Sequence, residues 1–198
     1  LLLGVAPFVL EGVAAFGPLI AAAWDEAGLL LASATGTTME CPGRATADGR
    51  WRCQALHGAK LPIGLAGRPF QGVAAIARHE NRAALRAAII HPGESTMTFY
   101  SRASREAAPW LPAGEVRIEG SPSALSLAAE EALLMAPGSG AVQRMRMEDG
   151  SLAEAARAVP SHEGHLWQAA CSMPNGGVAR LALNPEDPLV LEPTLLLP

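Results

Sequence analysis

Lysine is nearly absent from this sequence, and aromatic side chains are scarce. Of 198 residues only 5% are aromatic, and Lys60 is the only lysine among 15 basic residues. Acidic residues number 19, so the net charge is -4, which excludes a broadly basic nucleic-acid-binding protein. With 49% hydrophobic residues and no regular glycine repeat, the chain is neither disordered nor collagen-like. A globular protein remains, with a core filled mostly by small side chains.

Charged residues are missing from the first 24 positions except for Glu11. A run of that length is long enough to cross a membrane, but glycine and proline residues interrupt it and no basic residue flanks it. Buried strands also read as continuous apolar runs, so we expect strands around a Gly-Pro turn rather than a membrane span. The length of 198 residues predicts one globular domain, with a weak candidate boundary at residues 109–114. Because the sequence starts at Leu1 rather than Met, we expect a chain that is processed, trimmed or a fragment of a longer one.

Cysteine occurs three times, which is too few for a scaffold held together by disulfides. Cys41 and Cys53 bracket a polar loop, and a hairpin there would place them opposite each other. A disulfide would fit an exported protein or part of an extracellular assembly, whereas reduced thiols would fit a cytoplasmic one. The sequence favours the cytoplasmic interpretation.

Apolar and polar residues alternate along much of the chain, which is typical of strands. The segment 19–33 predicts a hairpin, because Asp25-Glu26-Ala27-Gly28 separates two apolar runs. Residues 109–114, rich in proline and glycine, predict a turn region. The other predicted strands are 50–56, 73–77, 96–101, 115–119, 141–147, 166–171, 177–183 and 189–197.

Three segments predict short helices. Residues 81–90 have Asn81 as a candidate N-cap and Leu85 and Ile89 four apart. Residues 121–135 have proline at the first helical position, and residues 151–159 open with a capping-box pattern. The predicted fold class is therefore α+β, with a largely antiparallel, sandwich-like sheet and about three short helices.

The segment with the most chemical character is Ser161-His162-Glu163-Gly164-His165. His162 and His165 are three apart, so they would share a face on a helix and there bind a metal such as zinc. Glu163 would then serve as general base, although the spacing is one residue short of the zincin motif. A polar loop with two surface histidines explains the same residues without a metal.

Arginine and tryptophan supply the other candidate contacts. Arg78, Arg82 and Arg86 recur every four residues and would form a stripe on the predicted helix 81–90, suited to phosphate or an acidic partner; a solvated helix face is the alternative. Trp110 and Trp167 are candidates for stacking on a sugar or anchoring a protein partner. Trp110, between Pro109 and Leu111, is expected to be exposed, whereas Trp24 and Trp51 lie in predicted strands and are expected in the core.

No complete catalytic motif is present, so the sequence favours a non-catalytic binding or accessory module. The expected partner is a protein subunit, a second copy, or a carbohydrate, with no nucleic acid and no cofactor. The apolar end of the chain, residues 189–198, would suit a sheet edge of another chain. The alternative is a small metal-assisted hydrolase or lyase that uses zinc at His162 and His165, with Glu163 as base.

Overall fold

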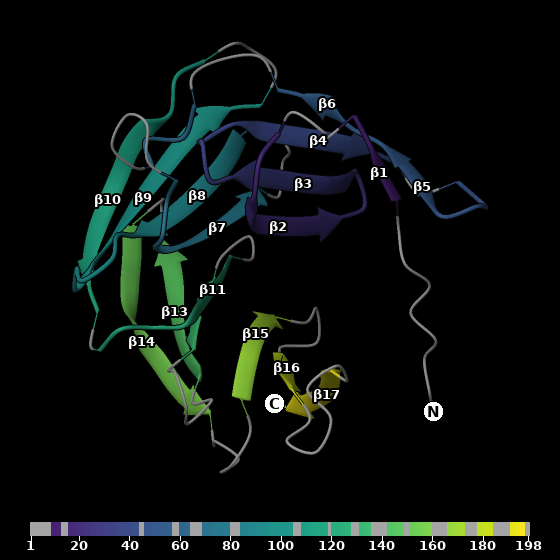
Figure 1. The fold of residues 1–198 in the computed structure, drawn as a ribbon. Helices are drawn as coiled ribbons and strands as arrows, with labels where there is room; N and C mark the ends of the chain where they lie inside the picture. The colour runs from purple at the N-terminus through teal and green to yellow at the C-terminus, as the bar shows by residue number, and fades with distance from the viewer. Residues whose placement is uncertain are drawn as a thin grey trace.

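Figure 1 shows the computed structural model of the chain, in which every regular element of the described part is a strand. The predicted α+β class is therefore wrong: the described residues form several antiparallel sheets and no helix. Nor do they include a helix that is long and apolar enough to cross a membrane. The described residues are 9–12, 16–43, 46–56, 60–63, 69–79, 84–104, 108–118, 120–127, 131–135, 142–148, 151–159, 166–172, 178–183 and 191–196.

The first sheet has the strand order β2-β3-β4-β6, and each strand is antiparallel to its neighbour. The predicted hairpin is confirmed, because β2 and β3 pair across a turn at Glu26 and Ala27. Gly28 closes that turn with a φ of 126°, and a Cβ there would lie 2.2 Å from the carbonyl oxygen of Cys41, so glycine is required on both counts. The strands are β2 (Leu19–Asp25), β3 (Gly28–Ser33), β4 (Thr38–Pro42) and β6 (Gln54–Ala55).

The second sheet has the order β10-β9-β8-β7 and includes a segment predicted as helix. Residues 84–90 of that segment form β8, whose two faces are both buried. Leu85, Ala87 and Ile89 pack toward the first sheet, while Ala88 and Ile90 pack toward the third. The turn predicted at residues 109–114 is also wrong from Leu111 onward, because these residues pair with β9 around a bulge. The strands are β7 (Val73–Arg78), β8 (Ala84–Ile90), β9 (Thr96–Ala103) and β10 (Leu111–Arg117).

The third sheet, with order β11-β12-β13-β14, replaces the other two predicted helices. Within residues 121–135 the chain forms two antiparallel strands, and Leu127, Ala132 and Leu134 enter the core shared with the second sheet. Residues 151–159 form β14, which pairs with β13 along its length. The strands are β11 (Ala124–Leu127), β12 (Glu131–Met135), β13 (Val142–Glu148) and β14 (Ser151–Val159).

The fourth sheet confirms the strands predicted near the end of the chain. It has the order β15-β16-β17, with antiparallel pairs throughout. A separate two-stranded parallel sheet joins β1 to β5. These strands are β15 (Leu166–Ser172), β16 (Val178–Leu183), β17 (Leu191–Leu196), β1 (Val9–Glu11) and β5 (Arg50–Arg52).

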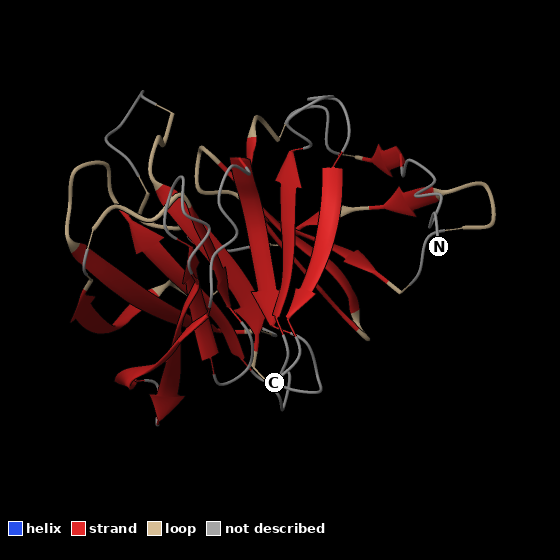
Figure 2. Cartoon of the chain, turned by 90° about the horizontal axis from the view of Figure 1, so that it is seen from below, coloured by secondary structure: helices blue, strands red, loops and turns tan. Residues whose placement is uncertain are grey.

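The four sheets follow one another in an arc, as Figure 1 shows, and Figure 2 shows the same all-strand chain from below. In each sheet the strand that comes first in the sequence contacts the corresponding strand of the next sheet. These strands are β2, β7, β11 and β15. One buried cluster fills the space between the first and second sheets, and another the space between the second and third. The first and fourth sheets therefore lie at the two ends of a row of face-to-face sheets.

Candidate functional site

The first sheet has an inner face toward the second sheet and an outer face directed away from it. Leu30 and Ala32 of β3 belong to the core shared with the second sheet. Leu29 and Leu31, one position along the strand, belong to a different cluster on the outer face. This alternation follows from the period of two in a strand, so both faces of this sheet are apolar.

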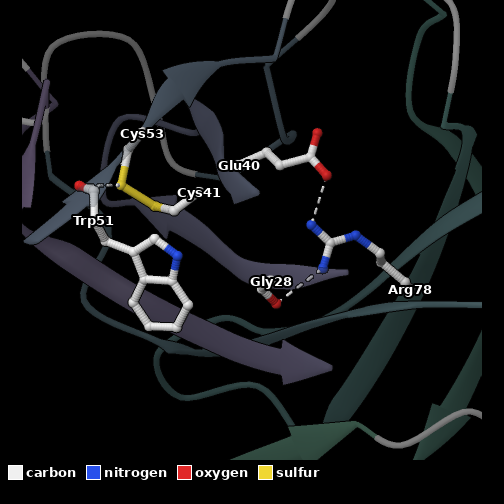
Figure 3. Close-up of a disulfide and its surroundings, with 6 residues drawn as sticks. All are labelled: Gly28, Glu40, Cys41, Trp51, Cys53 and Arg78. Carbon is white, nitrogen blue, oxygen red and sulfur yellow. Dashed lines mark hydrogen bonds and ion pairs between the residues drawn. A yellow bond between two sulfur atoms is a disulfide. The ribbon is translucent and has the colours of Figure 1, made fainter. Parts of the chain in front are cut away.

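Part of the outer face is covered by the chain segments around β1 and β5. Phe16 and Trp51 are buried against Leu31, Met39 and Cys41. A disulfide joins Cys41 of β4 to Cys53, just after β5, with their Cα atoms 4.0 Å apart. Figure 3 shows this disulfide beside the Trp51 ring. The bridge fixes the β5 segment onto the sheet, which settles the pairing that the sequence left open.

The outer face of β2 carries exposed side chains. In the strand register Leu19 lies opposite Ser33, Ala22 opposite Leu31 and Trp24 opposite Leu29, so all three side chains project from the outer face. All three are exposed, Trp24 to 70% and Leu19 to 49%. We call Leu19, Ala22 and Trp24 the Trp24 patch.

Trp24 is held by an aromatic neighbour although it is exposed. Its ring meets the buried Trp51 ring edge to face, with centroids 5.9 Å apart and planes at 88°. Such a pair contributes about 0.5–1.5 kcal/mol beyond burial. Because the disulfide holds the segment that carries Trp51, the exposed Trp24 ring packs against a neighbour that is itself held in place. The prediction that Trp51 lies in the core is confirmed, and the same prediction for Trp24 is wrong.

An ion-pair network joins the first and second sheets. Nη1 of Arg78 donates to both carboxylate oxygens of Asp25 at 3.0 and 3.1 Å, and to the Gly28 carbonyl at 3.3 Å. Nη2 donates to Glu40 at 2.8 Å, as Figure 3 shows. The Arg78 side chain is only 5% exposed. The carboxylates of Asp25 and Glu40 compensate the positive charge of this buried guanidinium, which would be costly to bury without a partner.

The predicted arginine stripe does not form, because the helix that would display it does not exist. Arg78 lies on β7 and points to the first sheet. Arg86 lies on β8 at a position that alternates with Leu85 and Ala87, so it projects from the opposite face of the second sheet. Arg82 lies outside the described residues. A stripe of adjacent guanidinium groups is therefore not available to a phosphate.

Trp110, which was expected to be exposed, is only 7% exposed and belongs to the core between the first and second sheets. The guanidinium carbon of Arg102 lies 5.6 Å from the centre of its ring, in a cation-π arrangement. Burial lowers the pKa of the Arg102 guanidinium from its ordinary value. Trp167 lies on β15, but its side chain is outside the described part.

The histidine segment cannot be placed. His162, Glu163 and His165 all lie outside the described residues, so zinc binding there stays a prediction. In the part of the chain that the structure does describe, no group of three or more histidine, cysteine, aspartate or glutamate side chains could hold a metal ion.

Solved structures resemble this chain in fold but not in sequence. The WD40 domain of coronin from Toxoplasma gondii is 13% identical, with a TM-score of 0.50, over 91% of this chain and 46% of that one. Such domains are β-propellers, rings of four-stranded sheets around a central channel. The fold is β-propeller-like. The sheets of the arc correspond to blades, and β2, β7, β11 and β15 to the innermost strands.

Two further structures share weaker similarity. A protein of unknown function from Bacteroides caccae is 14% identical, with a TM-score of 0.48, over 85% of this chain and 57% of that one. A gluconolactonase from Xanthomonas campestris is 16% identical, with a TM-score of 0.42, over 85% of this chain and 61% of that one. The chain thus spans about half the length of the structures it matches. No protein-family description and no curated sequence matches it.

Sequence reasoning missed Trp24, Asp25 and Glu40. Trp24 was assigned to the core because it lies in a strand, although the alternation of Ala22 and Trp24 with Ala21 and Ala23 separates the two faces. No local pattern marks the carboxylates, because Asp25 and Glu40 are 53 and 38 residues from Arg78.

Proposed function

We propose that this chain is a non-catalytic protein-binding module and that the Trp24 patch is its binding surface. The observation that carries the proposal is the 70% exposure of a tryptophan that packs edge to face against a buried one. Tryptophan is enriched among the residues that dominate the energy of protein interfaces. A side chain that already packs against a neighbour loses less conformational entropy on binding than one without a contact.

The surroundings of the patch favour a protein partner with an apolar surface. Leu19, Ala22 and Trp24 form a row along one strand, which suits the flat apolar centre of a protein interface. Charged groups lie on the segments that carry the Trp51 ring: Arg50, next to Trp51 in β5, pairs with Glu11 of β1 at 2.8 Å. A central apolar area with charged groups around it is the usual anatomy of such interfaces.

The propeller-like fold is compatible with this function but does not establish it, since one fold serves many functions. A carbohydrate partner has less support, because the Trp110 ring, one of the two predicted to stack on a sugar, is buried. The side chain of Trp167, the other one, lies outside the described part. The zinc-dependent hydrolase or lyase at His162, Glu163 and His165 stays an alternative that depends on residues outside the described part.

Photo-cross-linking tests the proposal. A photoreactive phenylalanine analogue replaces Trp24 in one sample and Leu111 in another. Leu111 is a matched control because it is 60% exposed and lies on β10, the outermost strand of the second sheet. We expect protein adducts from position 24 and few from position 111. Equal adducts from both positions, or none from position 24, would contradict the proposal.

A further inference from the structure

A single covalent bond joins the first sheet to the segment that covers part of its outer face. We call that segment, residues 46–53 with β5, the cover. Trp51 is the buried side chain of the cover, and it packs against apolar side chains of β3 and β4. The disulfide between Cys41 and Cys53 links the end of the cover to β4, beside the Trp51 ring in Figure 3.

The other attachments of the cover to the sheet are short. β5 pairs with β1, and these two strands form a sheet of their own. The chain joins the first sheet at β6, where Gln54 and Ala55 pair with β4. The ion pairs of Arg50 with Glu11 and Asp48 are exposed to solvent, where such pairs contribute little. Once the disulfide is broken, the burial of one tryptophan is the main contact left between the cover and the sheet.

The surface under the cover continues the Trp24 patch. Ala22 lies opposite Leu31 in the strand register, and Leu31 lies opposite Met39. The three side chains therefore form a row across the outer face of β2, β3 and β4. Ala22 is exposed, whereas Leu31 and Met39 are buried in one cluster with Trp51. Removal of the cover would extend the exposed apolar row across two more strands.

The two cysteines differ in exposure, which decides where a reductant can attack. Cys41 is fully buried, and Cys53 is partly exposed. Thiol–disulfide exchange begins with attack of a thiolate on a sulfur that it can reach. The bond is therefore accessible from the side of Cys53, the residue that ends the cover.

From this arrangement we infer that the disulfide is a redox-sensitive switch: a dithiol reduces it, the cover leaves the sheet, and the apolar surface beside Trp24 widens. As a control of the binding surface, this inference rests on the proposed function. Reduction would also separate Trp24 from the Trp51 ring against which it packs, so both the extent and the order of the surface change together.

The exchange consumes one dithiol for each disulfide. A thiolate of the dithiol bonds to Sγ of Cys53, and the bond to Cys41 breaks, so Cys41 leaves as a thiolate and takes up a proton. The second thiol of the reductant then bonds to the reductant's first sulfur, and Cys53 leaves as a thiolate and is protonated. The dithiol loses two electrons and two protons and becomes a disulfide, while the protein gains two thiols.

Hydroxyl-radical footprinting of the 198-residue chain tests the inference. One sample is reduced with dithiothreitol in buffer without denaturant and then freed of the reagent in the absence of oxygen. Met39, which is 4% exposed, should be oxidised at least about tenfold faster in the reduced chain than in the disulfide-bonded one. Met97 is the matched control, because it is a buried methionine in the core between the second and third sheets. Its oxidation should stay slow in both samples.

The double variant Cys41→Ala, Cys53→Ala gives a second measurement without any reductant. Its Met39 should be oxidised at the fast rate, and treatment with dithiothreitol should not change that rate. If this variant fails to fold, the comparison of the two wild-type samples still decides.

Three results would overturn the inference. The first is a disulfide that dithiothreitol leaves intact without denaturant, and the second is slow oxidation of Met39 in the reduced chain. The third is equally fast oxidation of Met39 and Met97, because the bond would then hold the whole fold rather than the cover.

The cross-linking experiment separates these failures from that of the proposed function. Adducts from position 24, with a cover that stays closed on reduction, would overturn the switch and leave the protein-binding function standing. A cover that opens, without any protein adduct from position 24, would overturn the proposed function and with it the control of binding.

Discussion

Arg78 on β7 binds Asp25 on β2 through both carboxylate oxygens, at 3.0 and 3.1 Å. The contact links the innermost strands of two neighbouring sheets at the ends that precede their hairpin turns. Since Nη2 of the same guanidinium also reaches Glu40 on β4, one buried arginine fixes the second sheet to two strands of the first.

Replacement of Arg78 by alanine should lower the free energy of unfolding by about 2–3 kcal/mol. The loss is smaller than the 3–5 kcal/mol typical of a fully buried pair, because Asp25 and Glu40 retain 36% and 28% exposure and some hydration. Urea unfolding measures the change. Arg52→Ala is the control, because that side chain is 91% exposed and lies 3.7 Å from Glu11, and such pairs contribute little. Equal losses in the two variants would contradict the role given to Arg78.

The disulfide between Cys41 and Cys53 should contribute about 3 kcal/mol to the free energy of unfolding, on the loop-entropy estimate. The two cysteines are 12 residues apart. The double variant Cys41→Ala, Cys53→Ala should show this loss in urea unfolding without a reductant. A thiol titration of the unreduced, unfolded wild-type chain should find one reactive thiol out of the three cysteines. Three reactive thiols would show that the bridge is absent from the purified protein.

Tyr100 should titrate above its ordinary pKa of 10.0. Burial raises the pKa of its phenol, and the negative charges of Glu115 and Glu94 raise it further. The folded chain therefore holds this proton more tightly than the unfolded chain does. The corresponding stability is present below about pH 10 and is lost as the pH rises through the folded pKa.

The ultraviolet absorbance of the phenolate measures this titration directly, because Tyr100 is the only tyrosine in the chain. Glu115→Gln should lower the midpoint toward 10, and Glu94→Gln should lower it less, since Glu115 is the stronger of the two electrostatic causes. A midpoint at or below that of the urea-unfolded chain would refute the burial of this phenol.

Far-ultraviolet circular dichroism should show a β-type spectrum without the paired minima of helices. The segments 81–90, 121–135 and 151–159 distinguish the two folds, because their described parts contain strands and no helix. A helical signal that disappears when these segments are enriched in β-branched residues would contradict the sheet assignment.

The sequence was sufficient for most strands but not for the elements buried on both faces. In 96–101 the β-forming residues predicted a strand, and in 141–147 alternation did so; β9 and β13 are there. In 81–90, Leu85 and Ile89 are four apart, a spacing that shares a face in a helix and also in a strand. Because β8 is buried on both sides, its sequence lacks the regular alternation of polar and apolar residues that indicates a strand. The spacing of Leu85 and Ile89 therefore led to the prediction of a helix.

The candidate site could not be predicted from the sequence for a different reason. Whether Trp24 is exposed depends on what packs beside the first sheet, and its local pattern is the same in either case. The Arg78 network joins positions on three strands of two sheets, so it becomes visible only with the topology known. The disulfide was recognised only as one of two alternatives, because Cys41 and Cys53 bracket one polar loop, and the sequence favoured reduced thiols over the bridge that the structure contains.

Hydroxyl-radical footprinting tests most directly the central claim that a protein partner covers the Trp24 patch. In the dilute, unassociated chain we predict rapid oxidation of Trp24 and slow oxidation of Trp51, which is 4% exposed. In the associated state we predict protection of Trp24 and unchanged oxidation of Leu111. Oxidation of Trp24 at the same rate in both states would contradict the account.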